Sequence, residues 1–226
     1  MEDRRFFSAT LRAVTIKRDS AGDEASCEAS LGDVLLSTLD KLVEMTRVLK
    51  SISAENAHCE QKHSFESLAK EVHGQEKVVT QRLLSVAEAD RPANDIVRLP
   101  YRLERIGDML ETVFASFENR KASGVRFSPQ SEAELDTLFS AVLDVMVHLR
   151  HALATSDVHA LESAISEDTR LSETLACYRL AHWERLWSGS CLPQASAIYL
   201  AILDSIKWTN EYLKKICVTL RNEATA

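Results

Sequence analysis

The chain has 226 residues, of which 45% are hydrophobic, so it is long enough for one or two domains with a substantial core. With only six glycines and four prolines, the composition excludes a turn-rich all-β fold and favours long helices with few connections. A formal net charge of −7, without any segment rich in lysine and arginine, argues against a nucleic-acid-binding protein.

Cysteine usage and hydrophobic runs indicate where the protein resides. The five cysteines are odd in number and have no C-x-x-C spacing, which predicts reduced thiols in a cytosolic protein. The N-terminus has no apolar run of signal-peptide length, and no stretch approaches the roughly 18 apolar residues that cross a membrane. We therefore expect a cytoplasmic protein with no transmembrane segment.

Residues 1–29 have a mixed character and precede the first clear helical pattern. Basic residues alternate with apolar ones from Phe6 to Ile16, and acidic and small residues follow. The pattern predicts an N-terminal arm, a short helix or strand that docks on the body of the protein. A partly ordered terminus and an arm that contacts a membrane or a partner are also compatible with it.

Apolar residues recur with helical spacing from Ser30 onward. Positions at i, i+3, i+4 and i+7 predict helices over about 30–54 and 58–89, followed by a third helix that ends near residue 122. These three helices make up a first repeat, residues 30–122.

The third helix contains two prolines near its start. Asp90 is the expected N-cap, Pro92 is tolerated in the first turn, and Pro100 is expected to kink the helix. The predicted core stripe of this helix consists of Ile96, Leu99, Leu103, Ile106, Leu110, Val113 and Phe117.

The segment from Lys121 to Pro129 is the clearest linker in the chain, because it carries a glycine and ends in a serine-proline pair typical of a helix start. Three further helices are predicted over about 130–154, 158–187 and 192–222.

The second triplet of helices repeats the first. A shift of 104 residues maps the first helix onto the fourth, including Asp40 onto Asp144. A shift of 103 maps the stripe of the third helix onto Tyr199, Ile202, Ile206, Thr209, Leu213, Ile216 and Leu220. We therefore predict an all-α fold of two tandem antiparallel three-helix bundles, with the second repeat over residues 128–222.

A row of carboxylates follows one side of the third helix. Glu104 and Asp108 are i and i+4 neighbours, and Glu111 extends the row. Such a like-charge pair costs about 0.2–0.5 kcal/mol, and Gly107 costs about 1 kcal/mol relative to alanine in a helix interior. A cation or close backbone packing is expected to compensate.

Helical geometry places this row roughly 110–170° from the centre of the apolar stripe. The three carboxylates are therefore expected on the outer face of their bundle, beside Tyr101. A charged row in this position is usually a solvated face, and a metal site is the alternative.

The hexapeptide Leu-Glu-Arg-Ile-Gly-Asp, residues 103–108, resembles the signature of the PhoU-like family of phosphate-uptake regulators. Residues 71–84 are similar to the helix that precedes the signature in that family. The resemblance implies a cytoplasmic, commonly dimeric protein at the inner face of the membrane. It also implies action by binding, not catalysis, with the phosphate transporter's ATPase subunit and a membrane sensor kinase as partners.

The resemblance also implies a metal site. Family Glu-x-x-x-Asp pairs bind metal ions on the bundle surface, which implies the same for Glu104 and Asp108, with Glu111 beside them. His73 occupies the position of a family acidic or amide residue, and an imidazole there favours iron or zinc over magnesium. The expected ion is iron, manganese or zinc, and a plain surface histidine is the alternative for His73.

The second repeat departs from this pattern. Lys207 stands at the position of Glu104, Glu211 stands at that of Asp108, and Asp204 lies one turn earlier. A Lys-x-x-x-Glu pair can form its own ion pair. Asp204 and Glu211 are therefore expected to be remnants of a second site that binds metal weakly or not at all.

Two other functions remain open from the sequence. One is a metal-dependent enzyme built on Glu104, Asp108 and His73, and the other is a metal-free helical adaptor in which Gly107 serves only close packing. No nucleophile with its base and no phosphate-binding glycine loop is recognisable, so we expect a protein that is not an enzyme.

Two further groups of residues are candidates for sites or contacts. One group shares a helix face and is either a metal triad or an ordinary polar face: Asp144, His148 and His151. The other group is expected to serve packing or a dimer interface: Trp183, Trp187 and Trp208.

Overall fold

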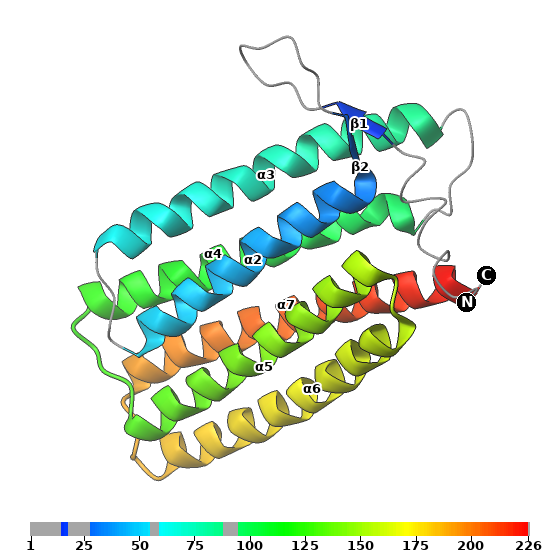
Figure 1. The fold of residues 1–226 in the computed structure, drawn as a ribbon. Helices are drawn as coiled ribbons and strands as arrows, with labels where there is room; N and C mark the ends of the chain where they lie inside the picture. The colour runs from blue at the N-terminus through cyan, green and yellow to red at the C-terminus, as the bar shows by residue number, and fades with distance from the viewer. Residues whose placement is uncertain (1–14, 18–27, 55–58, 88–94, 226) are drawn as a thin grey trace.

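The computed structural model describes residues 15–17, 28–54, 59–87 and 95–225. Long helices dominate this part of the chain, which confirms the all-α class (Figure 1). The helices are α2 (Leu31–Ser53), α3 (Cys59–Ala87), α4 (Leu99–Ala122), α5 (Pro129–Thr155), α6 (Val158–Trp187) and α7 (Pro193–Thr225), with a short 3-10 helix, η1 (Ile96–Arg98), before α4.

Part of the predicted N-terminal arm is a strand pair. β1 (Thr15–Lys17) and β2 (Glu28–Ser30) are antiparallel, with Thr15 opposite Ser30. This pair leads directly into α2. The rest of the arm, and with it the question of a membrane or partner contact, lies outside the described residues.

Capping side chains fix two helix starts, of which the sequence predicts the one at Ser128 and Pro129. The Ser30 side chain accepts a hydrogen bond from the Asp33 amide, and the Asp33 carboxylate accepts one from the Ser30 backbone N–H, which is a capping box. The Ser128 hydroxyl accepts a hydrogen bond from the Ser131 amide, and Pro129 follows at the first helical position.

The predicted N-cap Asp90 and Pro92 lie outside the described residues. The expected kink at Pro100 is wrong, because the described chain has η1 followed by α4, which begins at Leu99. Pro100 lies in the first turn of α4, where its missing N–H and fixed φ cost nothing. The proline therefore helps to start this helix.

The helices of each triplet contact one another, and the two triplets also pack together. Equivalent helices meet across this boundary, α2 with α5 and α4 with α7 (Figure 1). Lys50, near the end of α2, donates a 2.7 Å hydrogen bond to Ser140 in the first half of α5. Asp40, earlier in α2, pairs with Arg150 near the end of α5. Arg102 at the start of α4 donates to Thr219 near the end of α7 at 2.6 Å, so both pairs are antiparallel.

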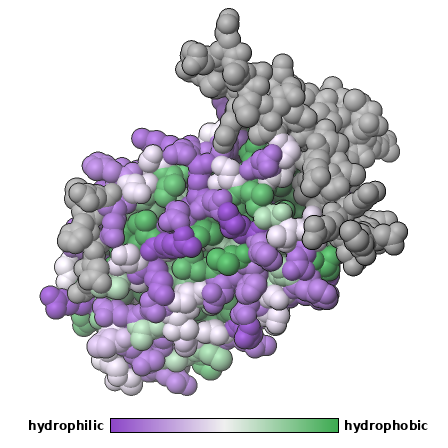
Figure 2. Space-filling view, in the orientation of Figure 1, coloured by the Kyte–Doolittle hydropathy of each residue, from purple (hydrophilic) through white to green (hydrophobic). Residues whose placement is uncertain are grey.

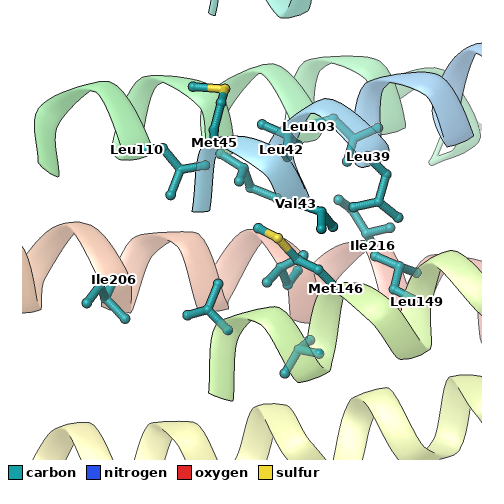
Figure 3. Close-up of a cluster of buried hydrophobic side chains, with 14 of the residues drawn as sticks. Leu39, Leu42, Val43, Met45, Leu103, Leu110, Met146, Leu149, Ile206 and Ile216 are labelled. Atoms are coloured by element: carbon teal, nitrogen blue, oxygen red, sulfur yellow. The ribbon is translucent and has the colours of Figure 1, made fainter. Parts of the chain in front are cut away.

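One core runs through both triplets. Figure 3 shows side chains of α2, α4, α5 and α7 that lie toward one another, among them Leu42, Leu103, Met146 and Ile216. Every residue of the predicted stripe of the third helix, and every one of its counterparts in α7, is at most 3% exposed. The periodicity therefore identified the buried faces of both helices correctly.

The outer surface is mixed in polarity. On the face drawn in Figure 2, hydrophilic residues alternate with smaller hydrophobic areas. Trp183, Trp187 and Trp208 are 47%, 92% and 50% exposed, so none of them is a core packing residue.

Among the described helices, α5 alone is long and apolar enough to cross a membrane. It contacts α2, α6 and α7 in the bundle, and its Leu138, Val145 and Leu149 are fully buried. In this structure α5 is a core helix.

Candidate metal centre

Gly107 sets the distance between α3 and α4 at the carboxylate row. A Cβ atom added at this position would lie 3.1 Å from Val72 Cγ1 and 3.8 Å from Leu42 Cδ2. Val72 and Gly107 are both buried. The missing side chain thus allows α3 to approach α4 closely, and this contact accounts for a glycine in the helix interior.

His73, the residue after Val72, extends from α3 to the carboxylates of α4. Its Nδ1 is 3.1 Å from Glu104 Oε1, and its Nε2 is 2.6 Å from Glu111 Oε1. The same Nε2 lies 3.8 Å from Asp108 Oδ1. The structure therefore brings together all four residues that the sequence predicts for the first-repeat site.

Arg105 is a fifth member of this cluster, and the sequence analysis did not identify it. Its guanidinium donates to Glu104 from Nε at 2.7 Å and from a terminal nitrogen at 2.8 Å. Its other terminal nitrogen lies 2.7 Å from Asp108 Oδ2. The guanidinium also lies 5.3 Å from the ring centroid of Tyr101, within cation–π distance.

The expectation of an outer, solvated face is wrong for Glu104, which is only 9% exposed. Asp108 and Glu111 are partly exposed. The reason is that α4 contacts α2, α3 and α7, so more of its circumference is covered than one apolar stripe indicates. The row faces α3, at the edge of the α3–α4 contact.

Negative charge dominates the electrostatics of the cluster. The cluster contains three carboxylates and the guanidinium of Arg105, so it carries two net negative charges when His73 is neutral. Burial alone would lower the pKa of His73, but the hydrogen bonds and charges of Glu111 and Glu104 outweigh it and raise this pKa. Burial, together with the charge of Glu104, raises the pKa of Asp108.

Three of these residues have the geometry of a metal-ligand set. One ligand atom each from His73, Glu104 and Asp108 lies within 4.8 Å of the other two. Glu111 hydrogen-bonds one imidazole nitrogen, an arrangement that in metal sites orients a histidine whose other nitrogen is the ligand. Imidazole with two carboxylates suits iron, manganese or zinc.

The second-repeat remnants are not brought together. Asp204 forms an ion pair with Arg179 of α6. The Lys207 ammonium lies 5.9 Å from the ring centroid of Trp208, and it forms no ion pair with Glu211 within the described residues. No second set of metal ligands occurs in the part of the chain that the structure describes.

A hydrogen-bonded contact replaces the close glycine packing in the second repeat. Asn210, at the position of Gly107, donates to the Asp168 carbonyl at 3.0 Å and to Ser172 Oγ at 2.9 Å. The Asp168 carboxylate is fully buried, with Lys214 Nζ at 3.5 Å. Burial raises the pKa of Asp168 to about 6, although Lys214 opposes this shift.

The predicted triad on α5 does not form a ligand set. His148 Nδ1 hydrogen-bonds the Asp144 backbone carbonyl, and His151 lies 3.7 Å from Asp157. Among the described residues the ligand atoms of this triad do not meet, so the polar-face interpretation holds.

Comparison of the chain with protein-family models, with curated proteins and with solved structures finds no match. The resemblance to PhoU-like proteins therefore rests on the motif residues of the sequence itself.

Proposed function

We propose that this protein is a PhoU-like regulator of phosphate transport that acts by binding other proteins and carries one metal ion in its first repeat. The regulatory role and its partners, a transporter component and a sensor kinase, come from the resemblance of residues 71–84 and 103–108. The metal ligands are His73, Glu104 and Asp108, with Glu111 orienting the imidazole.

A single observation supports the metal ion most directly. Imidazole and carboxylate atoms of His73, Glu104 and Asp108 converge within 4.8 Å at a cluster with excess negative charge. Carboxylates crowded in this way repel one another, and a divalent cation relieves the repulsion. When bound, the ion would link α3 to α4 and stiffen this face for docking.

A metal-free adaptor is the second candidate, and Arg105 favours it. This guanidinium contacts both Glu104 and Asp108, so the cluster already holds one internal cation. A protonated His73 supplies another, since its pKa is raised. In that function the cluster would only fix the relative position of α3 and α4.

Metal content separates these two functions. The protein is purified without chelators or an affinity tag, and metal per chain is measured by mass spectrometry. We expect about one equivalent of a transition metal, lost in Glu104→Ala/Asp108→Ala and retained in Asp204→Ala/Glu211→Ala as the matched control. No metal in any variant, even after reconstitution with iron, manganese or zinc, would favour the adaptor.

The regulatory role needs a separate test in the source cell. Deletion of the gene should change phosphate uptake, and the wild-type chain should restore it. Affinity capture from membranes should recover a phosphate transporter component or a sensor kinase. Unchanged uptake together with no such component in the captured fraction would contradict the regulatory proposal while leaving the metal site unaffected.

A further inference from the structure

A cavity lined by polar side chains and by the apolar Phe127, Leu192 and Ala195 lies at the end of the bundle where α5 and α7 begin and α6 ends (Figure 1). The cavity has a volume of about 170 Å³ and is partly open to solvent. Its polar lining consists of Arg126, Ser128, Ser131, His182, Ser190 and Ser196, beside the ring of Tyr199. None of these residues belongs to the carboxylate cluster.

The buried charges next to the cavity cancel one another. Arg185 donates to both oxygens of Glu134, at 2.8 and 2.7 Å, and Tyr199 donates to the same carboxylate. Burial acts to raise the pKa of Glu134, but these hydrogen bonds outweigh it and lower this pKa, so Glu134 and Arg185 form a neutral pair. Burial, with the charge of Arg185, lowers the pKa of His182 and keeps its imidazole neutral.

One positive charge on the lining remains unbalanced. Arg126 lines the cavity and is exposed to solvent. Within the described ranges it pairs with no carboxylate. A ligand in the cavity therefore meets a lining whose net charge is positive.

Two helix N-termini add to this positive potential. α5 begins at Pro129, directly after the lining residue Ser128, and α7 begins at Pro193, three residues before the lining residue Ser196. Each N-terminus carries about half a positive elementary charge from the helix dipole. Both termini and Arg126 thus favour an anion at the same place.

The cavity also contains a buried polar group whose hydrogen bonding is incomplete. His182 is 1% exposed, and its Nε2 hydrogen-bonds Ser196 Oγ at 2.7 Å. Its Nδ1 has no hydrogen-bond partner among the described residues. Buried polar groups are almost always paired, so this nitrogen of a cavity-lining residue is a group that a bound ligand can satisfy.

We propose that this cavity binds a small oxyanion, of the size of phosphate, sulfate or a short carboxylate. Arg126 provides the charge. Ser128 and Ser131 share one hydrogen bond, so one of their two hydroxyl protons remains for the anion. The Ser196 hydroxyl keeps its proton when His182 Nε2 donates to it. The volume supports a small ligand, because sites for drug-sized molecules occupy roughly 300–1,000 Å³. The site is independent of the metal proposal.

The test uses the full chain carrying Glu104→Ala/Asp108→Ala in chelator-treated buffer, so that no metal can bind the anion in the first repeat. Inorganic phosphate, sulfate and acetate are titrated against chloride at matched ionic strength, and the His182 imidazole signals are followed by NMR. We expect saturable shifts with at least one oxyanion and none with chloride. Saturation by phosphate and sulfate would show that the cavity prefers a tetrahedral anion. Saturation by acetate alone would show that it prefers a planar carboxylate.

Arg126→Gln is the decisive variant, because this exposed side chain can be replaced without disturbing the core. Affinity should fall about tenfold or more with the loss of one charge-assisted hydrogen bond. Arg98→Gln, an exposed arginine in η1, is the matched control and should bind normally. Absence of saturable shifts, equal binding of chloride, or unchanged affinity in Arg126→Gln would overturn the proposal.

Discussion

The α3–α4 contact of the first repeat and the α6–α7 contact of the second differ at equivalent positions. In the first, Gly107 lies against Val72, and three carboxylates meet one histidine and one arginine. In the second, an asparagine takes the glycine position, and Lys207 and Lys214 stand where Glu104 and Glu111 stand in the first.

The two contacts differ in how their charges are arranged. The second contact has two lysines, Lys207 and Lys214, for the two carboxylates of Glu211 and Asp168, and Lys214 Nζ lies 3.5 Å from Asp168. The first contact has excess negative charge beside the His73 imidazole. The repulsion between its carboxylates destabilises the fold unless a cation binds there. Within the described residues, the grouping of a histidine with two carboxylates that the proposed metal site needs occurs only in the first contact.

The largest expected effect concerns the second contact. The folded-state pKa of Asp168 is about 6, above its ordinary value of 3.8, so the folded protein binds a proton there that the unfolded chain has lost. Stability therefore falls as pH rises from about 4 through 6. Asparagine at this position does not titrate. The free energy of unfolding of Asp168→Asn minus that of the wild type, measured by urea unfolding, should therefore increase by up to about 3 kcal/mol between pH 4 and pH 7.

Asp204→Asn is the control for this measurement, since it removes one exposed negative charge from the same repeat. A difference between Asp168→Asn and wild type that does not change with pH would show that the buried carboxylate has no raised pKa.

The next effect tests the glycine. Gly107→Asn places the residue of the second repeat into the first, where its Cβ would lie 3.1 Å from Val72 Cγ1. Overpacking should lower the free energy of unfolding by about 2 kcal/mol and move His73 away from the carboxylates. Chemical denaturation and metal titration measure the two consequences. Wild-type stability with full metal binding would refute the close-packing argument.

A third prediction concerns the pH dependence of metal affinity. The carboxylates raise the pKa of His73, and a metal must displace the proton from this imidazole. Affinity should therefore increase as pH rises, by up to about tenfold per pH unit below the raised pKa, and level off above it. Calorimetric titrations between pH 6 and 8 measure this slope, and the slope should disappear in His73→Gln.

The smallest expected effect concerns competition between the Arg105 guanidinium and a metal ion for the same carboxylates. Arg105→Gln removes the guanidinium from Glu104 and Asp108. Because Arg105 is partly exposed, the metal-free protein should lose less than about 1 kcal/mol of stability. Metal affinity should rise, since no internal charge competes for the carboxylates. Weaker metal binding in Arg105→Gln would make Arg105 a necessary part of the site.

The sequence predicted the buried faces well because helical period alone determines them. The stripe of α4 and its counterpart in α7 needed no tertiary knowledge, and Ser30 and Ser128 carried their cap signals locally. The juxtaposition of His73 with Glu104 followed from the family resemblance, not from spacing.

The missed features depend on packing between helices or on side-chain length. Glu104 is buried because α3 packs beside it, and the hydrophobic periodicity of α4 gives no information on where α3 lies. The contact of Arg105 with Glu104 was not readable from spacing, because neighbours at i and i+1 do not share a helix face. Its i, i+3 spacing to Asp108 was an available signal for the second contact. Glu134 is buried with Arg185 and Tyr199, and its place on the apolar stripe of α5 beside Ser131 and Leu138 was an available signal.

The most direct test of the account is the number and location of metal sites in solution. Chelator-treated protein is titrated with Mn²⁺ and with Zn²⁺ by calorimetry at pH 7.5, beside His73→Ala/Glu104→Ala and the control Glu211→Ala. We predict one site per chain in the wild type and in Glu211→Ala, and none in the double variant, with circular dichroism confirming that all three remain helical. Two equal sites, no site, or a site that survives in the double variant would contradict the claim that the first repeat alone binds metal.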